Sequence, residues 1–177
     1  QNYTWHSKPD AALWPFIADY LPLLAENLPP HELSSTQNLR ALRMIARLPA
    51  VPQMLVPSLI NACTAEARSV RSAAQALLMG APGVTPQIVA ALDDSRQAIR
   101  ANAAAFLGQR GDDSVLPDVI AALGKEKADL ARASMISAIA ALGGDTSKWL
   151  GKAALEKEAA ANAKKLKGDK TDWLAMD

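Results

Sequence analysis

The sequence predicts an all-α protein in which short helices stack in pairs as an α-solenoid, an alpha-alpha superhelix. Apolar residues recur at three- and four-residue spacing along most of the chain, which is the period of amphipathic helices. Four helical segments begin with an arginine, and these arginines follow one another at intervals of 31, 29 and 32 residues. Half of the 177 residues are hydrophobic but only 5% are aromatic, so alanine and leucine must form a core of closely packed helices.

The N-terminal part is predicted to be a flexible segment, residues 1–9, followed by a capping-helix region, residues 10–38. The stretch "DAALWPFIADYLPLLAENL" has apolar residues at helical spacing. Asp10 can cap its first turn, and Pro22 is expected to kink or interrupt the helix because it removes a backbone hydrogen bond. The aromatic residues of this helix are Trp14, Phe16 and Tyr20. We expect them to cover the open end of the stack, with an aromatic pocket as the alternative.

Residues 39–144 are predicted to hold the repeated pairs, each made of a proline-led helix and an arginine-led helix. The proline-led helices begin at Pro57, Pro86 and Pro117. Proline suits a first helical turn because the amide hydrogen that it lacks would have no partner there. Aligned apolar positions in these helices, which we expect to be buried, are Cys63, Leu92 and Leu123.

The arginine-led helices start at Arg40, Arg71, Arg100 and Arg132, and each carries one apolar stripe. Counted from the residue before the arginine, the stripe occupies positions 0, 4, 7 and 8, which lie on one face of a helix. In the three clearest helices these positions are Val70, Ala74, Leu77 and Leu78; Ile99, Ala103, Phe106 and Leu107; Ala131, Met135, Ala138 and Ile139. The helix at Arg40 fits less well, since Arg43 stands at position 4. The glycines expected to end these helices with positive φ angles are Gly108, Gly111, Gly143 and Gly144.

These residues resemble a HEAT-type helical repeat. The proline-led helix, the acidic corner, the apolar–Arg pair, the alanine positions and the Leu-Gly pair carry the resemblance over residues 39–144. It implies a solenoid whose units bury their apolar faces only against neighbouring units, and it implies almost nothing about function. A narrower resemblance, strongest in "LGKEK…ARA…ALG", is to large cytoplasmic bacterial proteins related to the molybdate metabolism regulator. In that family helical repeats precede a conserved domain of unknown function, sometimes with an N-terminal WGR domain.

Residues 145–177 are predicted to form a C-terminal helix and a tail. The candidates for the N-cap of this helix are Asp145, Thr146 and Ser147. Its lysines are Lys157, Lys164, Lys165 and Lys167, with Glu156 and Glu158 beside the first of them. These glutamates and the lack of an aromatic neighbour for base stacking favour a solvated face over an RNA contact. The tail residues expected to dock are Trp173, Leu174 and Met176. Because the chain begins at Gln1 and not at Met, we expect it to be a fragment of a longer protein.

The repeated arginines Arg71, Arg100 and Arg132 allow two interpretations. An acidic residue precedes each of them, namely Glu66, Asp94 and Glu126. We expect each acid to cap the helix and to pair with the arginine of its own unit, as a structural bond. The alternative is a ladder of arginines that holds an acidic partner or phosphates.

The arginine-led helices have no charge on the face opposite to the apolar stripe. Positions 2, 6 and 9 of this face are Ser72, Ala76 and Met79; Ala101, Ala105 and Gly108; Ala133, Ser137 and Ala140. A solenoid that grips DNA would place Lys and Arg there. Either neighbouring units cover this face, or another polypeptide packs on it. We take eight of the nine residues, all but Gly108, as candidates for contact with a partner.

No pattern of a catalytic, cofactor or metal site occurs in the sequence. His6 and His31 have no further ligand at suitable spacing, and Cys63 is expected to be a buried small hydrophobe. Motifs such as GxSxG, HExxH and the P-loop are absent. The sequence therefore predicts no catalysis, no cofactor and no metal in this segment.

The expected function is protein–protein interaction, or intramolecular scaffolding, within a larger cytoplasmic bacterial protein. The partner would be another protein or other domains of the parent chain, and the oligomeric state is left open. No apolar run approaches the length of a membrane span. The balance of 19 basic against 18 acidic residues argues against nucleic acid. Two alternatives remain: a nucleic-acid-binding solenoid, including helical-repeat DNA glycosylases, or the regulatory arm of an enzyme whose active site lies elsewhere.

Overall fold

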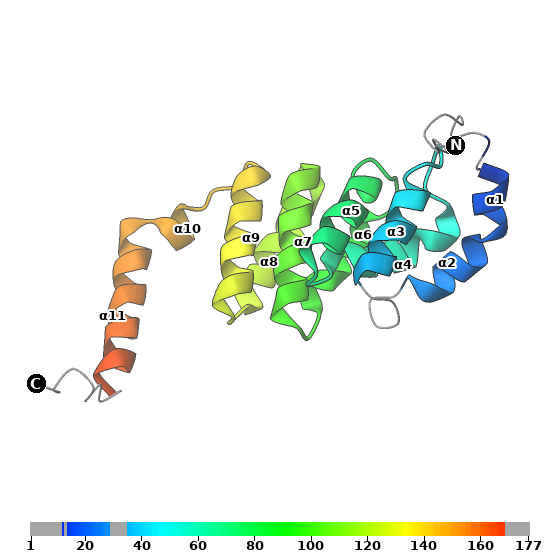
Figure 1. Cartoon of the computed structure of the whole chain (residues 1–177). Coiled ribbons are helices and arrows are strands. Elements are labelled where there is room, and N and C mark those ends of the chain that lie inside the picture. Colours follow the sequence, from blue (N-terminus) through cyan, green and yellow to red (C-terminus); the bar gives the residue numbers. More distant parts are fainter. Residues whose placement is uncertain (1–11, 13, 29–34, 169–177) are drawn as a thin grey trace, which may run out of the picture.

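The computed structural model describes residues 12, 14–28 and 35–168. Within these residues every regular element is a helix and no strand occurs. The helices lie side by side in one row, from α1 and α2 at one end to α8 and α9, with α10 and α11 beyond them (Figure 1). The predicted all-α solenoid is therefore confirmed. The predictions for the flexible segment 1–9, for Asp10, for both histidines and for the tail residues Trp173, Leu174 and Met176 lie outside the described residues.

The N-terminal end of the row consists of α1 (Trp14–Asp19), α2 (Leu21–Asn27) and α3 (Ser35–Ile45). The chain breaks between α1 and α2 at Tyr20, and Pro22 stands in the first turn of α2, as the expected interruption requires. Trp14, Phe16 and Tyr20 are all exposed. The indole N–H of Trp14 donates to the carbonyl oxygen of Arg47 at 2.8 Å, which ties α1 to the chain after α3.

Three helix pairs follow, and each first helix has proline in its first turn, as predicted. They are α4 (Val56–Thr64) with α5 (Arg68–Leu78), α6 (Thr85–Ala90) with α7 (Gln97–Arg110), and α8 (Leu116–Lys125) with α9 (Asp129–Ala141). Short 3-10 turns lie beside the first helices: η3 (Gln53–Leu55), η4 (Ala91–Asp93) and η5 (Asp113–Val115). The helix α7 packs mainly against α9, and also against α4 and α6.

The core lies between the two helices of each pair and between adjacent pairs. All twelve stripe residues of α5, α7 and α9 are buried except Leu77, which is partly buried, so the predicted stripe is confirmed. The aligned positions Cys63, Leu92 and Leu123 are buried as well. Phe106 and Met135 are fully enclosed, and α7 and α9 have the most extensive contact between any two of the described helices.

The four glycines fall into two groups. Gly111 and Gly143 have φ angles of 68° and 78° at the ends of α7 and α9, as predicted. The prediction is wrong for Gly108 and Gly144, because both are required for close packing instead. Gly108 lies within α7, where a Cβ atom would come 3.0 Å from the Cα atom of Ala138 in α9. At Gly144 a Cβ atom would come 2.7 Å from the side chain of Ile139.

The chain after α9 begins like a further repeat and then departs from it. Before α8, Asp112 Oδ1 accepts the backbone N–H and the hydroxyl of Ser114 at 3.2 and 2.6 Å. After α9, Asp145 Oδ1 accepts the same two groups of Ser147 at 2.9 and 2.6 Å. The helices that follow are α10 (Ser147–Leu150) and α11 (Lys152–Gly168).

The segment α10–α11 cannot pack as η5 and α8 do, because its residues at the matching positions are charged. The buried residues Val115, Val119 and Leu123 correspond, at the same distances from the aspartate, to Lys148, Lys152 and Glu156. All three of these are exposed. In Figure 1 α11 accordingly extends away from the row of paired helices.

A pair of glycine substitutions tests the assignment of the corners. Gly111→Ala should lower the free energy of unfolding by about 1 kcal/mol, because an alanine at positive φ is strained. Gly124→Ala should raise it by up to about 1 kcal/mol, because Gly124 lies within α8 with nothing within 4 Å of its added Cβ. Urea denaturation of the two variants measures both changes, and shifts of the same sign would contradict the assignment.

Candidate functional site

The repeated arginines lie at the corners between the two helices of each pair, where the last carbonyl groups of the first helix have no partner within that helix. Each arginine donates from Nη1 to carbonyl oxygens of the corner residues that directly follow this helix or the 3-10 turn beside it, six residues before the arginine in all three cases and also five residues before it for Arg71 and Arg100. The bonds are Arg71 to Ala65 (2.7 Å) and Glu66 (2.9 Å), Arg100 to Asp94 (2.7 Å) and Ser95 (2.9 Å), and Arg132 to Glu126 (3.2 Å). A cation placed at these carbonyls also opposes the negative end of the helix dipole.

The expected ion pairs within each unit are wrong in the part of the chain that the structure describes. Asp94 accepts the backbone N–H of Arg96 at 2.8 Å and its Nε at 3.1 Å, and it forms no ion pair with Arg100. Glu126 pairs with Arg100 of the preceding helix pair, Nε to Oε2, at 2.5 Å. The carboxylates of Asp94 and Glu126 both accept backbone N–H groups at the start of the second helix of their pair. This turns each carboxylate away from the arginine of its own unit.

Glu126 joins two helix pairs through four hydrogen bonds. Its carboxylate accepts Nε and Nη2 of Arg100, the latter at 2.9 Å, and the backbone N–H groups of Lys127 and Ala128 at 2.9 and 2.8 Å. Its side chain is only 4% exposed. The hydrogen bond from Arg100, above all, lowers the pKa of Glu126 from 4.5 to about 2. Similarly, the hydrogen bond from Arg96 holds the pKa of Asp94 below its usual value.

The end of α4 is held by three donors, of which the sequence predicted only Arg71. Gln75 Nε2 donates to Cys63 O at 3.0 Å, and Asn102 Nδ2 donates to Thr64 O and Ala65 O at 2.8 and 3.1 Å. The signal that could have found these residues is an amide side chain within an alanine-rich helix, beside the repeated arginine. Because Gln75 lies on α5 and Asn102 on α7, successive helix pairs share the same set of carbonyls.

The end of α5 is held in the same way by Arg110, the last residue of α7. Arg110 donates from Nη1 to the carbonyl oxygens of Leu78 and Met79, the latter at 2.9 Å, and from Nη2 to Ala81 at 3.2 Å. The sequence did not predict this role, because Arg110 does not recur at the repeat interval. Both ends of α7 are thus bonded to the preceding helix pair.

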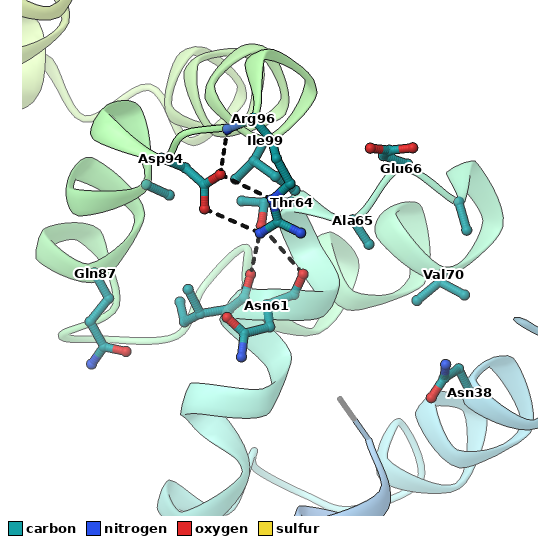
Figure 2. Close-up of a pocket in the computed structure, with 13 residues that line it drawn as sticks. Asn38, Asn61, Thr64, Ala65, Glu66, Val70, Gln87, Asp94, Arg96 and Ile99 are labelled. Atoms are coloured by element: carbon teal, nitrogen blue, oxygen red, sulfur yellow. Dashed lines mark hydrogen bonds and ion pairs between the residues drawn. The ribbon is translucent and has the colours of Figure 1, made fainter. Parts of the chain in front are cut away.

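Two adjoining hollows lie at the corners where α5 and α7 begin. The first, here called the corner hollow, has a volume of about 670 Å³ and lies between α3, the end of α4 and the start of α7. Figure 2 shows Arg96 folded against Asp94 above Asn61 and Thr64, while Gln87 and Glu66 lie on opposite sides. Ile60, Val70 and Ile99 supply its apolar lining.

The second hollow, here called the α7 groove, has a volume of about 570 Å³ and runs over α7 between α5 and α9. Its floor consists of small residues of α7, namely Ala98, Ala101 and Ala105. Arg71 lines it from α5, and Leu130 and Ser134 line it from α9. Glu66 and Arg96 line both hollows, so the two hollows form one continuous surface around Arg96.

The structure distributes the eight candidate contact residues over different places. Ala101 is buried at 4% exposure and Ala105 is partly buried, and both form the floor of the α7 groove. Ala133 and Ser137 are exposed and line a hollow beside Trp149, here called the end hollow. Ala76 is exposed and lines an uncharged hollow between the ends of α3 and α5. Ser72, Met79 and Ala140 are exposed and line none of these four hollows.

The described residues include no group of three or more His, Cys, Asp or Glu residues that could hold a metal ion. Burial raises the pKa of the Cys63 thiol to about 12, and its Sγ lies 3.2 Å from Ile60 O, so this thiol stays protonated. Lys157 of the basic C-terminal helix is exposed, which both interpretations of this helix allow. Among the described helices, none is both long and apolar enough to cross a membrane.

The helix pairs, their proline-led starts and the shared arginine corners define this class of protein as an α-solenoid built from helical repeats. A family model described as HEAT repeats matches residues 56–142, which extend from the start of α4 to the end of α9. This segment is therefore HEAT-like, as its residues predicted. A comparison with curated proteins gave no match. The narrower resemblance to proteins related to the molybdate metabolism regulator stays a prediction.

Replacing the carboxylate that joins two helix pairs should reveal its contribution to stability. Since the folded-state pKa of Glu126 is about 2 and its ordinary value is 4.5, the ionised group stabilises the fold above about pH 4.5. This contribution is lost as the pH falls from 4.5 towards 2. We expect Glu126→Gln to lower the free energy of unfolding by about 1.5–3 kcal/mol at neutral pH, and the difference from the unaltered chain to shrink to nothing in strong acid.

A matched control is Glu156→Gln. Glu156 lies 3.8 Å from Lys152 on the exposed surface of α11, and its loss should change the free energy of unfolding by less than about 0.5 kcal/mol. Guanidinium denaturation across the acid range compares the two variants. A Glu126→Gln difference that is independent of pH would show that the charge of Glu126 does not stabilise the fold.

Proposed function

We propose that this chain is a protein-binding module, in which the α7 groove holds a segment of another protein or of another domain of the parent chain. The observation that carries the proposal is the groove itself, a hollow of about 570 Å³ floored by alanines and walled by three successive second helices. Small side chains leave room for a partner's side chains, and solenoids offer such extended surfaces for binding.

The corner bonds support a binding role because they make the groove rigid before a partner arrives. Asn102 on its floor donates to the end of α4, and Arg71 on its wall donates to the same corner. A surface that is already ordered loses little conformational freedom on binding, so more of the contact energy appears as affinity. The mechanism we propose is therefore rigid presentation, with no catalytic step in this segment.

The wider setting is proposed from the resemblance of the sequence alone. We propose a module of a larger bacterial protein that acts in the cytoplasm and uses this solenoid to hold a protein partner or its own other domains. The two hollows at the corners lie where a neighbouring polypeptide would meet both the polar surface around Arg96 and the uncharged surface over α7.

Selection of binding peptides tests the proposed function. A random peptide library displayed on phage is selected against the whole immobilised chain, and the selected peptides are then measured against two variants. Ala105→Glu puts a large charged side chain on the floor of the groove, and Ala121→Glu puts the same side chain at an exposed position of α8. We expect binding to Ala105→Glu to fall at least about tenfold, and binding to Ala121→Glu to be unchanged.

Two outcomes would contradict the proposal. One is a set of peptides whose affinity falls equally in both variants, or in neither. The other is binding of duplex DNA at low ionic strength that weakens steeply with salt and is lost in Ala105→Glu, which would favour the nucleic-acid-binding alternative for the same groove.

A further inference from the structure

The contact between Arg100 and Glu126 supplies a template for what the α7 groove can bind. Arg100 uses its guanidinium group in two directions. Nη1 holds the carbonyl oxygens of its own corner, whereas Nε and Nη2 face the next helix pair and donate to the Glu126 carboxylate at 2.5 and 2.9 Å. Two parallel bonds of this kind match the planar geometry of a carboxylate.

Arg71 occupies the equivalent position one pair earlier, and of the two sets of bonds only those from Nη1 are present there. Its Nη1 holds Ala65 O and Glu66 O just as Arg100 holds its own corner. Among the described residues no acceptor bonds to Nε or Nη2 of Arg71. Arg71 is partly buried and lines the α7 groove. The guanidinium group whose Nε and Nη2 have no acceptor is therefore part of the wall of that groove.

The residue that should supply the missing carboxylate is Asp94, and it is engaged elsewhere. Asp94 precedes Arg100 at the same distance at which Glu126 precedes Arg132. Its side chain is one methylene shorter than glutamate, and Arg96 takes it through the backbone N–H, Nε and Nη2 at 2.8, 3.1 and 3.2 Å. Repeat geometry thus leaves a place for one carboxylate in the groove that this chain does not fill.

The guanidinium of Arg71 has no carboxylate partner among the described residues. Asp94 is bonded to Arg96, and Glu66 lines the same groove without forming an ion pair with Arg71. The N–H groups in the first turn of α7, which carries Ala98 in the groove, add positive potential there, and the Asp94 carboxylate bonded to the N–H of Arg96 offsets part of it.

We propose that the α7 groove binds an acidic segment of a partner polypeptide, with one Asp or Glu carboxylate on the Nε and Nη2 edge of Arg71. The residues beside that carboxylate would be small, to fit over Ala101 and Ala105, with an apolar one against Leu130, which is 55% exposed. The inference rests on the proposed function, since it names the chemistry of the polypeptide that the groove holds.

Two fluorescein-labelled peptide pools test the inference. Both carry Ala and Leu at randomised positions around a central residue, which is Glu in one pool and Gln in the other. Fluorescence anisotropy with the whole chain should show the Glu pool binding about tenfold more tightly than the Gln pool. Arg71→Lys should abolish this preference, because lysine cannot present two parallel donors. Arg68→Gln, which removes an exposed charge from the same helix start, should preserve it.

A spectroscopic readout avoids dependence on the folding of any variant. In the unaltered chain, the Nε–Hε resonance of Arg71 should shift on addition of the Glu pool, while that of Arg100 should stay fixed because Glu126 already occupies it. If the Arg71 resonance does not move, or if Arg68→Gln removes the preference as fully as Arg71→Lys, the carboxylate site is overturned. Equal binding of both pools that is lost in Ala105→Glu would overturn this inference and leave the proposed function standing. Failure of every selected peptide to depend on Ala105 would instead overturn the proposed function.

Discussion

The solenoid depends on one constraint, which is that the carbonyl groups at the ends of its short helices must be bonded where helices meet. A helix of nine residues, such as α4, leaves nearly half of its carbonyl groups without partners inside the helix. At a corner covered by neighbouring helices, an unbonded carbonyl would cost about 1–3 kcal/mol. The chain meets this cost with side-chain donors: a repeated arginine in each pair, with Gln75, Asn102 and Arg110 added around α7.

These donors also connect neighbouring helix pairs through shared hydrogen bonds. Gln75 and Asn102 come from different helix pairs, yet their acceptors are adjacent residues at the end of α4. Glu126 extends the same principle in the other direction, since it bonds to Arg100 and to the backbone at the start of α9. A displacement of one pair therefore strains the hydrogen bonds of the next one, and the groove over α7 moves as part of a rigid unit.

Much of the fold was predictable because it follows from spacing. The arginine intervals, the proline-led starts and the apolar stripes specify which segments are helices and which face is buried. The site was less predictable, because it depends on the length of each side chain and on the direction in which that side chain points. Asp94 and Glu126 occupy the same position in the repeat, but the difference of one methylene and the neighbouring Arg96 send their carboxylates to different partners. Similarly, nothing in the local sequence distinguishes Gly108, pressed against Ala138, from Gly111, which ends the helix.

The turn formed by Asp145 and Ser147 has a consequence for the length of the array. It copies the turn before α8, but α10 then ends at Gly151, whose backbone is extended, and charged residues stand where valine and leucine stand at and before α8. Both the break at Gly151 and these charges therefore keep α11 out of the stack. Aliphatic residues in place of the charges would give α11 the apolar stripe that the first helix of a further pair needs.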